Sequence, residues 1–338
     1  MSLVQTFGLD GIKTAEIETD CSRTWKINDY GRCQFTLSIR DPKCTLEHLQ
    51  FGNYILVEHE KLPAWGGVID TPREWGRNVV QITGYSAEKI FEWRRVAAVT
   101  KITATPGKIF KEIIRKANIQ GNTRISAGEN IITKGKAVAW EFNLLNVYDE
   151  IIRLAEDTDD EWRIVPKAKN GAITFDAQWA PRLGEVRNYL LKETHNIEAD
   201  NNVLVEQGQI ANDVYGIGNG ASDESKETAR LTDDDSIAKY GLRQYAKTFQ
   251  QDEYSSIKKG VRATINQMKE PKRTFSLSAL DVGDTWLNID VGDTLQLQMS
   301  NVGFLDDSFG LVTDVRIKGM TFLEDEGKLE LVAEEKYE

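Results

Sequence analysis

The chain has few of the residues that build metal centres and disulfide frameworks. Its 338 residues include three histidines and three cysteines. The cysteines stand close together in sequence, at Cys21, Cys33 and Cys44. An odd number without Cys-x-x-Cys spacing argues against disulfides and against structural zinc, so we expect reduced, partly buried thiols. The histidines lack His-Glu-x-x-His spacing and stand at His48, His59 and His195. We therefore assign no metal ligand.

Long apolar runs are also missing. No stretch approaches the roughly 20 apolar residues of a membrane-spanning helix. Residues 1–20 lack the basic start and apolar core of a secretory signal. The content of hydrophobic residues (40%) and charged residues (28%) is typical of a globular protein, and the length suits two or three domains. We expect no membrane segment and folding in the cytoplasm where the chain is made.

Excess positive charge is absent as well. The net charge of −11 predicts a surface that repels nucleic acid and anionic lipid. Binding to duplex DNA would need a basic stripe, and the candidate stretches are short and interrupted by acids. These candidates are Lys258, Lys259, Arg262, Lys269, Lys272 and Arg273. An acidic wall, by contrast, suits a conduit through which DNA slides without sticking.

Signatures of catalysis and cofactor binding are not found. The chain has neither Gly-x-x-x-x-Gly-Lys-Ser/Thr nor Gly-x-Ser-x-Gly. The glycine-rich stretch 216–220 runs into acidic residues rather than a helix, so we interpret it as a bend or bulge ending a strand over 213–217. Cys44 and His48 could share one side of a helix, but we interpret this as chance proximity. We assign no catalytic or cofactor-binding residue and expect no cofactor and no enzyme.

Two carboxylate clusters are candidates for a calcium site or an acid–base pair. They consist of Asp157, Asp159, Asp160 and Glu161, and of Asp233, Asp234 and Asp235. Neither cluster has the alternating ligands and central glycine of a calcium loop. Neither offers the contrasting environments that a pair of glycosidase carboxylates needs. We expect both clusters to be solvated surface.

The two ends of the chain resemble each other. The matching segments are 34–39 with 274–279, 51–58 with 291–298, 66–75 with 309–318, and 78–87 with 327–336. The first two pairs share an offset of 240, which aligns Phe35 with Phe275 and Gly52 with Gly292. Each copy alternates apolar and polar residues, which predicts four short antiparallel strands. Because such strands need a partner sheet or closure, each copy predicts a small barrel or sandwich.

A different composition separates the two copies. A helix is expected from Thr105 to Asn118, with proline at its first position. A second helix is expected from an N-cap at Asn143, with an apolar face that starts at Leu144 and Leu145 and ends at Ala155. The pair at 170–171, Asn-Gly, predicts a two-residue hairpin turn between strands at 162–165 and 172–176. Together these elements predict an α/β middle domain.

Two further segments precede the second copy. Residues 220–236 are polar and acidic, so we expect an exposed loop. Residues 252–268 predict a last helix with Ile257, Val261, Ile265 and Met268 inward.

Eight tryptophans are many for this length. They are Trp25, Trp65, Trp75, Trp93, Trp140, Trp162, Trp179 and Trp286. Several lie in alternating strand patterns, which favours core filling or protein contacts. A platform that binds carbohydrate is the functional alternative.

Nearly the whole chain, from about residue 5 to about 335, resembles a known family. The segments that carry the resemblance are GRCQFTLSIRDP, LQFGNYILVEHEKLPAWGGVIDTPRE, TPGKIFKEIIRKAN, NLLNVYDEIIRLAEDTDDEWRIVP, NDVYGIGNG, SIAKYGLRQYAKTF and IDVGDTLQLQM. In this order and spacing they resemble the hub proteins of phage tail tips, known in siphophages as tail-associated hub proteins. These hubs are similar in fold to the trimeric baseplate hubs of contractile tails.

The resemblance implies a fold and a division into domains. The expected fold class is α+β and β-rich, with two tube-like antiparallel β-barrel domains that flank an α/β middle domain as a pseudo-duplication. The first barrel is expected at 1–98 and the second at 191–224 together with 271–338. The middle domain is expected at 99–190 together with about 225–270.

The resemblance also implies partners and a location. Three subunits with two barrels each would form a homotrimeric ring that adapts the sixfold tail tube, or a distal tail protein, to a threefold tip. Expected partners are the tail tube or distal tail protein, a tip, spike or fibre protein, the tape-measure protein, and DNA only in passage. The expected location is the virion, at the tail tip or baseplate, after assembly in the cytoplasm of the bacterial host. Because the sequence stops just after the second barrel, we expect lysis and receptor binding to belong to other proteins.

Two other classes of function stay open. A tail-associated peptidoglycan hydrolase would need an acid pair or a metal triad, which the sequence does not offer. A carbohydrate-binding adhesin would use the tryptophans.

Overall fold

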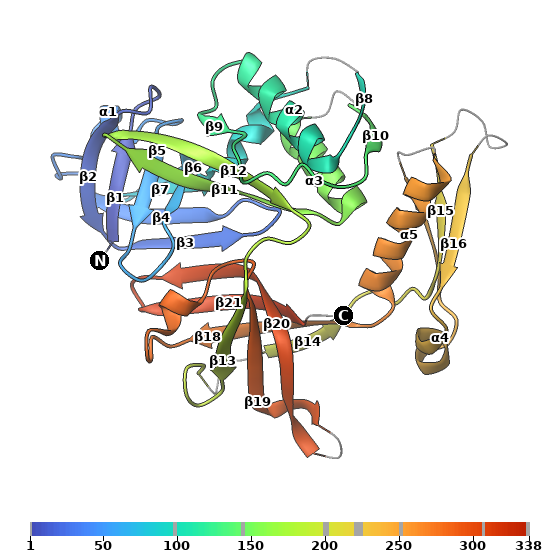
Figure 1. Ribbon diagram of the computed structural model, residues 1–338. Helices are drawn as coiled ribbons and strands as arrows, with labels where there is room; N and C mark the ends of the chain where they lie inside the picture. Colours follow the sequence, from blue (N-terminus) through green and yellow to red (C-terminus); the bar gives the residue numbers. More distant parts are fainter. Residues whose placement is uncertain are drawn as a thin grey trace.

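The computed structural model describes residues 2–96, 100–142, 146–198, 203–219, 226–249, 253–305 and 308–335. Strands make up more of this part of the chain than helices, so the expected β-rich α+β class is confirmed. Within these ranges, no helix has the length and apolar character needed to cross a membrane. Four units of structure follow along the chain (Figure 1).

The N-terminal strands form the first β-unit, in the order β3-β4-β7-β6-β5-β1-β2. Its elements are β1 (Ser2–Phe7), β2 (Lys13–Thr19), β3 (Cys21–Lys26), β4 (Arg32–Ser38), α1 (Leu46–Leu49), β5 (Tyr54–Glu58), β6 (Trp65–Trp75), β7 (Val79–Ser86) and the 3₁₀ helix η1 (Ala87–Trp93). In β4, Cys33, Phe35 and Leu37 are buried between more exposed neighbours, as the alternation predicts. In β5, residues 54–57 are all buried because the sheet is covered on both faces there.

The C-terminal strands form the second β-unit. Its elements are β13 (Val186–Lys192), β14 (Val203–Gln207), β18 (Lys272–Ala279), η3 (Thr285–Asn288), β19 (Thr294–Leu305), β20 (Ser308–Leu323) and β21 (Lys328–Glu335). Four of these strands lie in the order β18-β21-β20-β19, and β4-β7-β6-β5 is the order in the first β-unit. Gly319 to Phe322 of β20 pair with β3, which joins both units into one sheet. Its path ends at β14 and β2, so backbone bonds close no barrel in the described residues.

Between the two β-units lies the middle unit, drawn in green in Figure 1. Its elements are β8 (Lys101–Ala104), α2 (Pro106–Ile119), β9 (Ile125–Ser126), β10 (Val138–Glu141), α3 (Val147–Thr158), β11 (Glu161–Lys169) and β12 (Ala172–Ala180). Helix α2 begins with Pro106 directly after Thr105 and ends one residue beyond the expected Asn118. Asn170 and Gly171 both have positive φ, so the predicted hairpin turn between β11 and β12 is confirmed. The apolar faces of α2 and α3 share one core with β12 and with β5.

The predicted start of α3 is wrong. Its N-cap is Asn146, whose side chain accepts a hydrogen bond of 2.7 Å from the backbone N–H of Asp149, and not Asn143. This start places Asp149 and Glu150 in the first turn, where the helix dipole favours acids. Asn143, Leu144 and Leu145 lie outside the described residues.

A separate helix–sheet unit follows, with a core of its own. It comprises β15 (Asp213–Ile217), β16 (Thr228–Thr232), α4 (Asp234–Tyr240), β17 (Gln244–Thr248) and α5 (Tyr254–Met268). Ile257, Val261 and Ile265 of α5 are buried against the sheet, as predicted, and Met268 is half-buried. β15 falls within 191–224, the range expected for the second barrel, but it pairs with β16 and β17.

The expected exposed loop over 220–236 is wrong where the structure describes it. β16 and the start of α4 occupy residues 228–236, and 220–225 lie outside the described residues. The polar sequence of β16 does not indicate a strand, because pairing with β15 holds this segment in place. Within β16, Ala229 is the buried residue.

Candidate functional site

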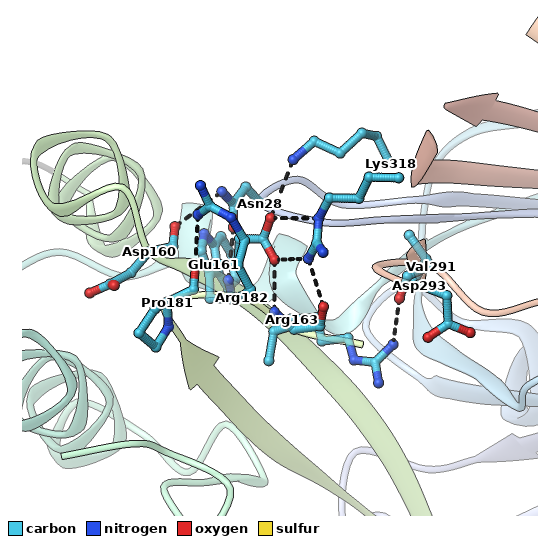
Figure 2. Close-up of polar contacts among 12 residues, drawn as sticks. Asn28, Asp160, Glu161, Arg163, Pro181, Arg182, Val291, Asp293 and Lys318 are labelled. Carbon is cyan, nitrogen blue, oxygen red and sulfur yellow. Dashed lines mark hydrogen bonds and ion pairs between the residues drawn. The ribbon is translucent and has the colours of Figure 1, made fainter. Parts of the chain in front are cut away.

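Polar side chains, most of them half-buried, gather at the point where the first β-unit, the middle unit and the second β-unit meet. We call it the polar junction; its residues are Asn28, Glu161, Arg163, Asp290, Arg316 and Lys318. Asn28 lies in the turn between β3 and β4 with φ of 61°. Its side-chain oxygen accepts a bond of 2.8 Å from the backbone N–H of Trp162, and its own N–H donates to the Trp162 carbonyl. Figure 2 shows Asn28 beside the start of β11.

Glu161 is the central anion of the polar junction. Its side chain is almost fully buried and accepts hydrogen bonds from Arg316, from Lys318 (3.3 Å) and from the backbone N–H of Leu183 (2.8 Å). Arg316 also donates to the Leu183 carbonyl at 2.6 Å. Because both cations come from β20, one carboxylate of the middle unit ties it to the second β-unit (Figure 2).

Arg163 makes a second tie two residues along β11. Its guanidinium donates to Asp290 at 3.0 Å, to the Val291 carbonyl at 3.1 Å and to Gln178 at 2.8 Å. The turn that it contacts is held from the other side by Asp293, which is 1% exposed, pairs with Arg187 and accepts from two backbone N–H groups. The turn before β19 is therefore fixed to the middle unit.

The expectation that the cluster at 157–161 is solvated is wrong for two of its members. Asp160 and Glu161 are buried, and Asp160 accepts bonds from Thr158 (3.0 Å) and from the indole N–H of Trp179 (3.1 Å). Burial raises the pKa of Asp160, and those two hydrogen bonds oppose the shift. Asp159 pairs with Arg182 and accepts from Gln267 of α5.

The second cluster is closer to the expectation. Asp234 and Asp235 are exposed, as predicted. Asp233 caps α4 by accepting from the backbone N–H of Ser236 and pairs with Lys269 at 3.3 Å. The backbone bond is the main cause that lowers the pKa of Asp233.

The candidate basic stretches are partly neutralised by neighbouring acids. Lys269 contacts Asp233, and Arg273 pairs with Glu206 at 2.7 Å and with Glu335 at 3.4 Å. Such pairing leaves less free positive charge for a nucleic-acid backbone.

In the part of the chain that the structure describes, the candidate catalytic groups named from the sequence do not come together. Helix α1 begins at Leu46, so Cys44 precedes it and does not share a helix with His48. His59 lies far from both, against the rings of Trp286 and Phe322, and burial lowers its pKa. In the described ranges, no three His, Cys, Asp or Glu side chains gather where a metal ion would be held. In the polar junction the carboxylates are bonded to cations and N–H groups, which suits support rather than proton transfer.

The tryptophans mainly fill cores. Trp65, Trp140, Trp162, Trp179 and Trp286 are buried, which confirms the core interpretation for these five. Trp75 and Trp93 are exposed by 67% and 43%, at the ends of β6 and η1.

No local pattern in the sequence pointed to the charged residues of the polar junction. Glu161 and Arg316 are 155 residues apart, and only the pairing of β20 with its neighbours brings Arg316 to the start of β11. Asn28 carried a weak signal, since Asn is favoured in left-handed turn positions and two residues that are common in turns, Asp29 and Gly31, follow it closely.

Comparisons with known proteins agree on one fold. The model of a family described as YQBQ-like matches residues 23–319. No curated protein sequence is significantly similar to the chain.

Three solved structures share the fold over almost the full length of both chains. Prophage tail protein gp18 of Listeria monocytogenes EGD-e has a TM-score of 0.61 at 13% identity, with 99% of this chain and 95% of that chain covered. The 43 kDa tail protein of prophage MuSo2 from Shewanella oneidensis has a TM-score of 0.61 at 10% identity, with 98% of this chain and 98% of that chain covered. A tail protein of Neisseria meningitidis MC58 has a TM-score of 0.61 at 11% identity, with 99% of this chain and 96% of that chain covered. The resemblance to phage tail proteins seen in the sequence is thus confirmed for the fold.

Proposed function

This chain belongs to the YQBQ-like family, and we propose that it is a structural, non-enzymatic subunit at the distal end of a phage or phage-derived tail. In this proposal three copies form a ring, the hub, that adapts the sixfold tail tube to a threefold tip and forms part of the DNA conduit. The observation that carries the proposal is the shared fold with three tail proteins over nearly their whole length.

The hub proposal needs two alike β-units in each chain, and several features support a duplication. The strand orders β4-β7-β6-β5 and β18-β21-β20-β19 are the same. Gly52 and Gly292, the pair aligned by sequence, have φ of 89° and 95°. Gly52 donates to the Ile69 carbonyl (2.9 Å) and Gly292 to the Ile317 carbonyl (2.7 Å), and each isoleucine donates back to the residue after the glycine (2.8 and 2.9 Å). Two alike β-units in each of three copies would give six β-units in the ring, which matches the sixfold tail tube.

The polar junction supports a mechanical role. A ring that transmits load from tube to tip needs its units held at a fixed angle, and Glu161, Arg163 and Asn28 tie three of them. We propose that the first β-unit and the second β-unit are the tube-like domains, and that the middle unit and the helix–sheet unit stand outside them.

The proposed partners follow from this position. One face would meet the tail tube or a distal tail protein, and the other a tip, spike or fibre protein. The lumen would hold the end of the tape-measure protein and then pass DNA during genome ejection. The virion would form in the cytoplasm of the bacterial host. The negative net charge suits a passage for DNA.

Electron microscopy of the assembled particle tests the proposal. We expect density for three copies of this chain in a ring at the end of the tube, with both β-units facing the lumen. A chain found elsewhere in the particle, or present in a number that is not a multiple of three, would contradict it.

A further inference from the structure

A small pocket opens beside the polar junction, where three units meet. Its volume is about 110 Å³, and we call it the junction pocket. β3 contributes Trp25, β6 contributes Trp65, β11 contributes Val165, and the segment before β19 contributes Asp290. Glu88 of η1 also lines the pocket.

Glu88 is a buried acid with an unused oxygen. Glu88 is 3% exposed. Its Oε1 accepts a hydrogen bond of 2.7 Å from the backbone N–H of Ile164. Oε2 is buried and has no hydrogen-bond partner among the described residues. A buried carboxylate oxygen without a donor is costly.

The cations around the pocket are already paired elsewhere. Lys26 binds Asp29 at 2.7 Å, and Arg163 binds Asp290 at 3.0 Å. Among the charged residues that line the pocket, Glu88 therefore has no ion-pair partner of its own. A donor of hydrogen bonds with positive charge would satisfy Oε2 of Glu88.

We propose that the junction pocket binds a primary ammonium group on a short alkyl chain, with Glu88 as its counter-ion. The volume is below the roughly 150 Å³ that holds benzene, so an amine of about four carbons is the upper size. The methylenes and the cation would lie against an apolar and aromatic wall formed by Trp25, Trp65 and Val165. The ammonium is supplied either by a small diffusible amine or by a lysine side chain of a partner protein. A bound ammonium would contact all three units at once.

Binding of n-butylammonium to the full chain tests the proposal. We expect saturable binding at pH 8 by calorimetry, at least tenfold weaker binding to Glu88→Gln, and unchanged binding to Glu92→Gln. Glu92 lies on the same η1 and its loss changes the net charge equally, but it pairs with Lys89 outside the pocket. n-Butanol, which matches the chain length without the charge, should not compete. Equal binding to Glu88→Gln, in protein shown by circular dichroism to be folded, would overturn the proposal.

The pH dependence gives a second readout. Burial raises the pKa of Glu88 to about 7, while the nearby Ser86 side chain, the backbone N–H of Ile164 and the charge of Arg163 oppose the shift. Lys26, Arg163 and Asp290 are the other charged groups that line the pocket. Because the ammonium binds the ionised carboxylate, its affinity should fall about tenfold from pH 8 to pH 6, and the fall should vanish in Glu88→Gln. An affinity that does not change with pH would also contradict the assigned counter-ion.

A second ligand distinguishes the two sources of the ammonium group, a small amine and a lysine side chain of a partner protein. Nα-acetyl-lysine N-methylamide carries the same ammonium on a side chain attached to peptide backbone. Its binding together with n-butylammonium would indicate a partner's lysine, whereas binding of n-butylammonium alone would indicate a small amine. Binding of neither ligand refutes the site and leaves the tail-hub proposal untouched.

Discussion

At the scale of single residues, the units are joined by charged groups of the polar junction as well as by shared apolar cores. Glu161 is 3% exposed and contacts two cations, whereas the ion pair of Glu112 with Arg115 on α2 lies at the surface. Desolvation makes a buried charge expensive unless its partners stay in place. The polar junction is therefore sensitive to loss of one member, and surface pairs are not.

Glu161→Gln should destabilise the fold by about 3 kcal/mol, because it removes the buried anion that the half-buried guanidinium of Arg316 contacts. The matched control Glu112→Gln removes the same charge from an exposed pair and should cost less than about 1 kcal/mol. Urea unfolding of the two variants and the parent measures both free energies. Equal effects would mean that the polar junction contributes no more than a surface pair.

At the scale of elements, Gly216 is required by the packing of α5 on β15 and not by a bend of the backbone. The sequence suggested a bend or bulge, yet β15 pairs in regular register with β16 across 213–217. A Cβ on Gly216 would lie 2.3 Å from a Val261 methyl and 2.8 Å from an Ile257 methyl. The glycine is needed because α5 packs directly on the strand.

Gly216→Ala should therefore push α5 away from its sheet and cost about 1–3 kcal/mol. The loss should be local, so amide exchange should accelerate in β15, β16 and α5 more than in the first β-unit. Gly319→Ala is the control, since a Cβ there meets nothing closer than 3.6 Å and φ is ordinary. A tolerated Gly216→Ala with unchanged exchange would contradict this account of the packing.

Local signals predicted the elements that local physics determines. Pro106 set the start of α2, and Asn170-Gly171 set the turn between β11 and β12. β16 was missed because partner strands rather than its own residues hold it. Buried Glu88 was missed because its neighbours Trp65 and Val165 come from distant strands, and no local pattern announces such a site.

At the scale of the whole molecule, the alignment of the two chain ends sets one pair of segments in a register that the hydrogen bonds do not share. The aligned segments 66–75 and 309–318 set Ile69 against Val312, whereas hydrogen bonds to the two glycine turns match Ile69 with Ile317. The reason is the length of β19 and β20, which extend well beyond β5 and β6. The displacement is five residues, an odd number, so the alignment sets the buried Ile69 against the exposed Val312 and exchanges the two faces of the strand.

The exposed face of the second β-unit leads to a prediction about assembly. Val203 pairs with Ser276, which pairs with Val332, so the two valines lie in one row on the same face, 51% and 45% exposed. In the proposed ring, a neighbouring copy would cover this row.

Light scattering should therefore give the purified chain, alone or mixed with its tail tube protein, three times the mass of one chain, 38.2 kDa. Val203→Lys combined with Val332→Lys should return the mass to that of one chain, because lysines would be trapped in an apolar contact. Leu242→Lys, at a 60% exposed site in the helix–sheet unit, should leave the mass unchanged. A parent chain that stays single under both conditions would rule out the ring, and a trimer that survives both lysines would place the contact on another face.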